Sequence, residues 1–183
     1  MRCYAIQPDQ ITLLDGYESF IYCFQRPDGK FILRIGHSGR RSPDLIRGEV
    51  DWINYLADHG APAARAILSQ QGSLVEPLDD GHGEQFLSTA FEHAPGDHVR
   101  GDKVTDRLNY NYGRLLGKMH RLAKNYQVSN PAWRRYTWDS PQNSTGEAHM
   151  PAREALALQK YLQVHQYLCG LPVDSESYGM IHQ

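Results

Sequence analysis

The chain has 183 residues, of which 40% are hydrophobic and 22% are charged, and its formal net charge is −2 at pH 7. This length suits one domain or a two-lobed unit with a substantial core, and this composition excludes a disordered or fibrous protein. The slightly acidic charge argues against a nucleic-acid partner, and without a signal peptide or a run of ~20 apolar residues we expect a cytoplasmic protein that binds no membrane.

The first part of the chain has the pattern of an antiparallel sheet. Two strands are predicted within residues 11–25, joined at residues 15–19. An Asp-Gly pair at residues 28–29 is typical of a hairpin turn, and a third strand follows at residues 31–36. Side chains alternate along a strand, so Arg34 should share its face of the sheet with the apolar residue two positions before it.

A helix is predicted over residues 42–60. Ser42 is a typical N-cap, Pro43 suits the first helical position, and Gly60 can end the helix. Glu49 lies within the apolar stripe of this helix. Its carboxylate should therefore be buried, and a buried carboxylate needs a partner.

The rest of the chain is predicted to hold two more strands, a Pro-Gly turn and two helices, at residues 72–78, 84–92, 95–96, 105–126 and 151–169. Thr105 or Asp106 should cap the first of these helices. Gly113 and Gly117 lie one turn apart within it. Because glycine lowers helix propensity, this pair predicts a closely packed partner.

The order of these elements resembles the aminoglycoside phosphotransferase and choline kinase branch of the protein-kinase-like fold. Six stretches carry the resemblance: GYESFIYCF as the phosphate-covering loop, FILRI as the third strand, RGEVDWINYLADHG as the helix, FEHAPGDHV as the hinge, YGRLLGKMH as the first large helix of the second lobe and YGMIHQ as the approach to the catalytic loop. The resemblance implies an α+β fold with an antiparallel five-stranded N-lobe and one helix over residues 1–93, which binds the nucleotide. A partial helical C-lobe would cover residues 94–183.

Enzymes of this branch are ATP-dependent kinases, so the resemblance implies transfer of a phosphoryl group to a hydroxyl of a small molecule. His182 matches a histidine that orders the catalytic loop, and the catalytic aspartate would be the residue after Gln183. The ligands of Mg²⁺ would also lie beyond this point, so no metal ligand is assigned and this chain alone should be inactive. Its exposed C-lobe faces would then be available to a homodimer. Two alternatives stay open: a non-catalytic, nucleotide-binding pseudokinase-like module, and an interaction protein unrelated to nucleotides.

The resemblance also assigns residues to the nucleotide phosphates. Arg34 stands where these enzymes usually have a lysine on the α- and β-phosphates, and Glu49 stands where a glutamate holds that cation. A guanidinium can bind a carboxylate and a phosphate at once, so we expect an ion pair. The alternative is an exposed strand arginine and a helix-surface acid. Gly16 and Ser19 would belong to the phosphate-covering loop, although a plain β-turn explains them almost as well.

The adenine is expected to lie beside the third strand and the hinge. Ile32 would pack near its face, and the backbone of Phe91, Glu92 and His93 would meet its edge. Aliphatic side chains in these places are also common core residues. The aromatic segment at residues 130–140 could line a substrate pocket or simply pack on its own aromatic rings.

Overall fold

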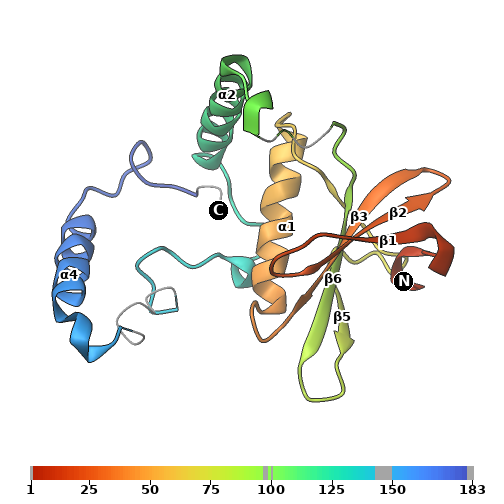
Figure 1. The fold of residues 1–183 in the computed structure, drawn as a ribbon, viewed down its shortest axis with the longest axis horizontal. Coiled ribbons are helices and arrows are strands. Elements are labelled where there is room, and N and C mark those ends of the chain that lie inside the picture. Colours follow the sequence, from red (N-terminus) through yellow and green to blue (C-terminus); the bar gives the residue numbers. More distant parts are fainter. Residues whose placement is uncertain (1, 97–98, 100, 143–149, 181–183) are drawn as a thin grey trace.

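The computed structural model describes residues 2–96, 99, 101–142 and 150–180. A twisted sheet lies on one side of the molecule, helix α1 (Pro43–Asp58) packs against it, and helices α2 (Asp106–Ala123) and α4 (Ala155–Cys169) lie beyond α1 (Figure 1). The predicted α+β, protein-kinase-like architecture of a strand-rich half followed by a helical half is confirmed. Within the described ranges, no helix is both long and apolar enough to span a membrane.

The sheet has six strands in the described residues, one more than predicted: β1 (Ile11–Leu14), β2 (Phe20–Arg26), β3 (Gly29–His37), β4 (Ala66–Ile67), β5 (Glu76–Asp79) and β6 (Gln85–Glu92). All of their pairings are antiparallel, with β3 between β2 and β6. The additional strand is β4, which pairs with the end of β6 through only two residues. So short a strand leaves no alternating pattern in the sequence.

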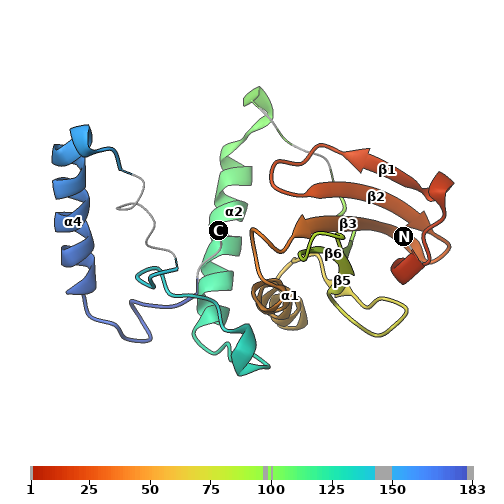
Figure 2. The same ribbon diagram turned by 90° about the horizontal axis from the view of Figure 1, so that it is seen from below.

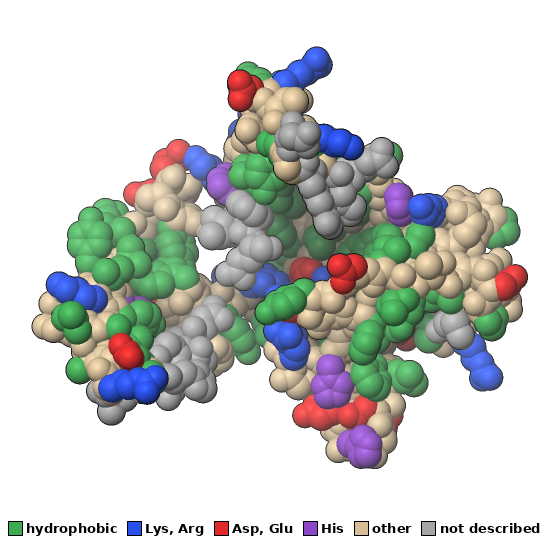
Figure 3. Space-filling model, in the orientation of Figure 1, with side chains coloured by type: hydrophobic (Ala, Val, Ile, Leu, Met, Phe, Trp, Pro, Cys, Tyr) green, Lys and Arg blue, Asp and Glu red, His purple; other side chains and the backbone are tan. Residues whose placement is uncertain are grey.

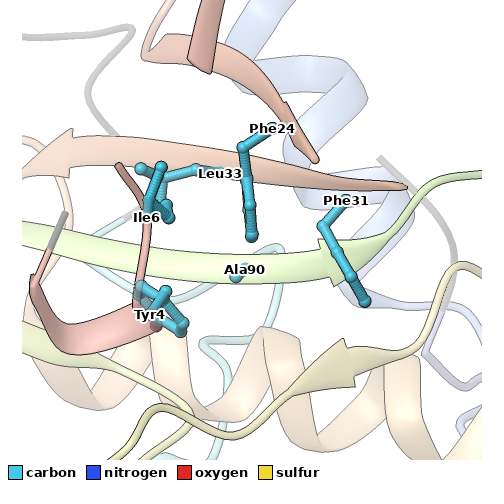
Figure 4. Close-up of a cluster of buried hydrophobic side chains, with 6 residues drawn as sticks. All are labelled: Tyr4, Ile6, Phe24, Phe31, Leu33 and Ala90. Carbon is cyan, nitrogen blue, oxygen red and sulfur yellow. The ribbon is translucent and has the colours of Figure 1, made fainter. Parts of the chain in front are cut away.

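One face of the sheet is covered by residues 2–10. Two short 3₁₀ helices, η1 (Arg2–Tyr4) and η2 (Pro8–Gln10), lie there, and Tyr4 is buried with its hydroxyl donating to the Ser88 carbonyl at 3.2 Å. Figure 4 shows the cluster that this segment closes, which contains Tyr4, Ile6, Phe24, Phe31, Leu33 and Ala90. The alternation of side chains along β3 predicts which residues face this cluster. Phe31 and Leu33 point into it as expected, and Arg34 points to the other face.

Helix α1 covers part of the opposite face. It begins as predicted, with the Ser42 hydroxyl accepting a hydrogen bond from the Leu45 amide at 3.3 Å and with Pro43 at the first position. Its apolar stripe packs on β6 and its neighbours in a second cluster of buried residues: Ile46, Val50, Ala66, Val75, Leu87 and Phe91. Because the stripe also carries Glu49, the same packing brings this carboxylate to the sheet.

The other side of α1 faces the helical half. Trp52 and Leu56 form a third cluster with residues at the end of α2, and Figure 2 shows α1 between α2 and the sheet. Gly48 lies directly against the 3₁₀ helix η4 (Pro131–Trp133), where a Cβ atom would be 2.0 Å from the Trp133 carbonyl oxygen. The aromatic segment at residues 130–140 thus begins as a packing element on α1.

The helices of the second half are largely exposed in this chain. Thr105 caps α2 by accepting from the Leu108 amide at 3.2 Å, and short 3₁₀ helices, η3 (Gly101–Lys103) and η5 (Ala152–Glu154), precede α2 and α4. Hydrophobic side chains gather on the surface over α4 (Figure 3), among them Leu156, Leu162, Val164, Tyr167 and Leu168. The packing partner predicted for Gly113 and Gly117 is absent, since no described atom lies within 4 Å of a Cβ built on either.

Candidate nucleotide site

The ion pair between Arg34 and Glu49 is confirmed. Arg34 Nη1 donates to Glu49 Oε1 at 2.5 Å, and the two side chains are only 21% and 18% exposed. The guanidinium also lies over the ring of Phe91, with 5.2 Å from its central carbon to the ring centroid. Strand alternation on β3 and the apolar stripe of α1 are sufficient to bring the two charges together. The reading of Arg34 as a solvated strand charge is therefore wrong.

The guanidinium of Arg34 retains an unused donor. Its Nη2 atom is buried and has no hydrogen-bond partner among the described residues. A buried donor without a partner costs about 1–3 kcal/mol, so it calls for an acceptor that the described chain does not provide. An anion such as a phosphate supplies that acceptor, and a guanidinium can bind it while it still donates to Glu49.

A cavity of about 310 Å³ opens beside this pair. Its walls come from the sheet, from α1 and from two loops, and its lining residues are Tyr17, Glu18, Ser19, Ile21, Arg34, Gly36, His37, Arg40, Arg41, Ile46, Glu49 and Leu87. Ser19 therefore lies in the same cavity as Arg34. The structure thus brings the loop at residues 15–19, the strand cation and the helix acid to one cavity.

Gly16 has a clear steric role in the loop at residues 15–19. A Cβ at Gly16 would lie 2.5 Å from the Ser19 carbonyl oxygen and 3.0 Å from a side-chain carbon of Ile21. The loop folds back on itself here, and only glycine fits. Gly16 does not line the larger cavity but a second one, of about 200 Å³, which it shares with Phe20 and Phe86.

Three arginines face the larger cavity, although the sequence reasoning singled out only one of them. Arg40 Nη2 lies 2.8 Å from Glu18 Oε1, and Arg41 Nη1 lies 3.3 Å from Glu49 Oε2. Against the three arginines stand two glutamates, Glu18 and Glu49, so cations exceed acids in this lining. The sequence does contain a signal for the other two, because Arg40 and Arg41 are adjacent in the loop that joins β3 to α1.

At the hinge, two of the predicted backbone groups are already used. The amide of Glu92 donates to the Arg65 carbonyl at 2.8 Å, and the amide of His93 donates to the Lys30 carbonyl at 3.2 Å. Phe91 is 9% exposed and belongs to the core under α1. Ile32 is half-buried, and it lies opposite Phe91 in the pairing of β3 with β6.

His182 and Gln183 lie outside the described residues, so the structure does not bear on the loop-ordering role predicted for His182. In the part of the chain that the structure describes, no three His, Cys, Asp or Glu side chains lie together as a group that could hold a metal ion.

A second acidic residue of α1 fastens the helix to the second half of the chain. Asp51 accepts hydrogen bonds from the Tyr126 hydroxyl at 2.5 Å, from the Ser129 hydroxyl at 2.5 Å and from the Ser129 amide at 3.2 Å. Burial, together with the hydrogen bond to Asp51 and its charge, raises the pKa of Tyr126 above its usual range. Helix α1 is thus held from both sides, and Glu49 has a fixed support.

The chain is similar to known proteins. The profile of the phosphotransferase enzyme family matches residues 10–183. The chain is 34% identical over 179 residues to an amicoumacin kinase of Bacillus subtilis (strain 168), a match that covers 98% of this chain and 53% of that protein. This chain thus spans about half the length of that relative.

Solved structures show the same similarity. A structure of amicoumacin kinase in complex with AMP-PNP, Ca²⁺ and Ami superposes with a TM-score of 0.90 at 34% identity, over 98% of this chain and 54% of that one. A microcompartment-associated aminopropanol kinase superposes with a TM-score of 0.74 at 19% identity, over 98% of this chain and 58% of that one. At that identity, the second likeness shows the fold alone.

Proposed function

The chain belongs to the phosphotransferase enzyme family, and we propose that it functions in an ATP-dependent kinase that phosphorylates a hydroxyl of a small molecule. The observation that carries this proposal is the buried, unpartnered Nη2 of Arg34 beside a cavity of about 310 Å³. Phosphoryl transfer depends mainly on positioning and on charge neutralisation, and a fixed cation beside an open cavity supports both.

Arg34 would bind the nucleotide phosphates, with Glu49 holding its guanidinium in place. The ion pair of 2.5 Å and the anchoring of α1 by Asp51 support this role, because a binding cation must be held before the ligand arrives. The loop at residues 15–19 would cover the phosphates, with the Ser19 hydroxyl as a hydrogen-bond donor. Gly16 would contribute by permitting the tight fold of that loop.

The adenine would lie against the uncovered part of the same sheet face. Ile32 is half-buried and adjacent to the hinge, which supports its contact with the purine ring. Since the amides of Glu92 and His93 already donate within the sheet, the adenine edge would be met by carbonyl groups of residues 91–93 and by the next amide, that of Ala94.

A divalent cation, expected to be Mg²⁺, would neutralise charge between the β- and γ-phosphates when bound. Its ligands are not assigned to any residue of this chain. The related amicoumacin kinase was solved with AMP-PNP and Ca²⁺, which supports a nucleotide and a divalent ion in the whole enzyme. We assign His182 the ordering of the catalytic loop.

Calorimetric titration of the chain with AMP-PNP in the presence of Mg²⁺ tests the nucleotide site. Arg34→Ala should weaken binding by roughly 10- to 100-fold, the equivalent of ~1.5–3 kcal/mol for hydrogen bonds to a charged group. Arg34→Lys should fall between the two, because lysine keeps the charge but loses the fork of donors. Arg26→Lys, in a surface hairpin where Arg26 pairs with Asp28, is a matched control.

Turnover should be measured on the full-length gene product, with amicoumacin as the first candidate substrate because a relative at 34% identity is named for it. ADP formation that depends on amicoumacin would support the kinase. Nucleotide binding without turnover on any hydroxyl would favour a non-catalytic module. A wild-type chain that does not bind AMP-PNP would contradict the proposal altogether.

A further inference from the structure

The cavity proposed for the phosphates contains an acid that needs an explanation. Glu18 lies in the covering loop and lines the cavity together with Arg34. A carboxylate at this place would repel a nucleotide phosphate unless a cation neutralised it. Glu18 does have such cations, since Arg40 Nη2 lies 2.8 Å and Arg41 Nη2 3.8 Å from its carboxylate oxygens.

Arg41 is the arginine that joins the two parts of the site. Its Nη1 atom lies 3.3 Å from Glu49 Oε2, on the same carboxylate that holds Arg34, while its Nη2 atom faces Glu18. The side chain is 43% exposed, twice as open as that of Arg34 at 21%. It can therefore exchange a partner without being pulled out of a core. The planar fork of a guanidinium binds a carboxylate and a phosphate with the same geometry.

We propose that Arg41 is a second polyphosphate-binding residue of this site, and that a bound phosphate replaces Glu18 as the negative charge that faces its Nη2 atom, which lies 3.8 Å from the Glu18 carboxylate. The inference rests on the proposed nucleotide site. When a triphosphate enters, Arg41 keeps Glu49 and exchanges Glu18 for a phosphate oxygen. Arg40, the more exposed arginine at 57%, keeps Glu18 beside the rim of the cavity.

The simpler reading is that these arginines form ordinary surface ion pairs with Glu18. Pairs this exposed contribute ~0–1 kcal/mol to stability, and that reading predicts no effect of either residue on nucleotide affinity. The two readings therefore differ in a measurable quantity, and variants at these positions should still fold.

The test compares the affinity of the chain for ATP, with Mg²⁺, and for adenosine, which lacks phosphates. Arg41→Gln should weaken ATP binding about tenfold and leave adenosine binding unchanged, a loss equivalent to about 1.4 kcal/mol. Glu18→Gln should change ATP binding in the opposite direction, to roughly threefold tighter, because it removes a competitor for Arg41. The double variant should bind ATP as weakly as Arg41→Gln alone. Arg47→Gln, which removes the ion pair of Arg47 with Asp44 outside the cavity lining, is the matched control and should bind both ligands normally.

The outcomes separate this inference from the function on which it rests. A wild-type chain that binds neither ATP nor adenosine overturns both. Normal ATP binding that Arg41→Gln does not weaken, or that it weakens equally for adenosine, overturns only the inference. So does a Glu18→Gln variant that binds ATP more weakly when Mg²⁺ is present, because Glu18 would then act through the metal. Thermal unfolding of each variant checks that it has the wild-type fold.

Discussion

Gly48→Ala should destabilise the protein, although the same change in an unhindered helix is stabilising. Gly48 lies in the middle of α1 and is buried against η4. A Cβ there would be 2.0 Å from the Trp133 carbonyl oxygen, whereas ordinary contacts begin at 3.4 Å. Helix α1 and η4 would have to separate by well over an ångström.

The size of the effect follows from the neighbouring contacts. Overpacking in a filled interface costs ~1–3 kcal/mol, and each lost hydrogen bond to the Asp51 carboxylate would add ~1.5–3 kcal/mol. In the other direction, alanine gains ~1 kcal/mol of helix propensity over glycine. We expect a net loss of about 1.5 kcal/mol in the free energy of unfolding, which is the lower end of the combined cost after the gain in helix propensity.

Urea denaturation followed by tryptophan fluorescence is a suitable assay, since Trp52 and Trp133 lie on either side of this interface. Gly117→Ala in α2 is the control, because no described atom lies within 4 Å of its Cβ. It should raise the free energy of unfolding by ~0.5–1 kcal/mol. If Gly48→Ala also stabilises the protein, the close contact of α1 with η4 is wrong, and with it the account of how Glu49 is supported.

Three further results are expected. Glu49→Gln should lower the free energy of unfolding by about 3 kcal/mol, since breaking a largely buried pair leaves Arg34 uncompensated; a loss below ~1 kcal/mol in urea denaturation would mean that the pair is effectively solvated. Tyr126 should lower the free energy of unfolding in alkali, because its pKa is raised in the folded state. Its contribution to that free energy is complete below the usual pKa near 10 and is lost as the pH rises further. Tyr126→Phe should therefore show a flatter decline of stability between about pH 10 and 12. An identical decline in the variant would contradict that assignment. Ser42→Ala should cost ~1 kcal/mol by removing the N-cap of α1, and an unchanged thermal midpoint would show that the cap is not formed.

Much of the sheet and of the site was predictable because it depends on local periodicity. The alternation of β3 places Arg34 on one face, and the helical repeat places Glu49 on the buried side of α1, so their meeting follows from the order of the elements. The Ser-Pro start of α1 was likewise readable, since its N-cap is a local hydrogen bond.

Other features were not readable because they depend on contacts between distant segments. The first ten residues have no strong periodicity, yet Tyr4 and Ile6 complete a core cluster on the back of the sheet. The two-residue β4 exists only because β6 offers it an edge. The roles of Glu18 and Arg41 need the path of two loops, which no residue pattern specifies.

The spacing of glycines also failed to predict which helix makes a close contact. Gly113 and Gly117 suggested close packing, but among the glycines inside the described helices the tight contact is at Gly48, which lies in the previous helix. Sequence spacing identifies glycines that lower helix propensity, and only the fold shows which of them has a neighbour.

The central claim is that Arg34 binds the nucleotide phosphates, and nitrogen-15 NMR of the arginine side chains tests it most directly. The Nε signal of Arg34, assigned by its loss in Arg34→Lys, should shift when AMP-PNP is added and stay in place when adenosine is added. A signal that stays fixed while AMP-PNP demonstrably binds would contradict the account, because the phosphates would then lie elsewhere.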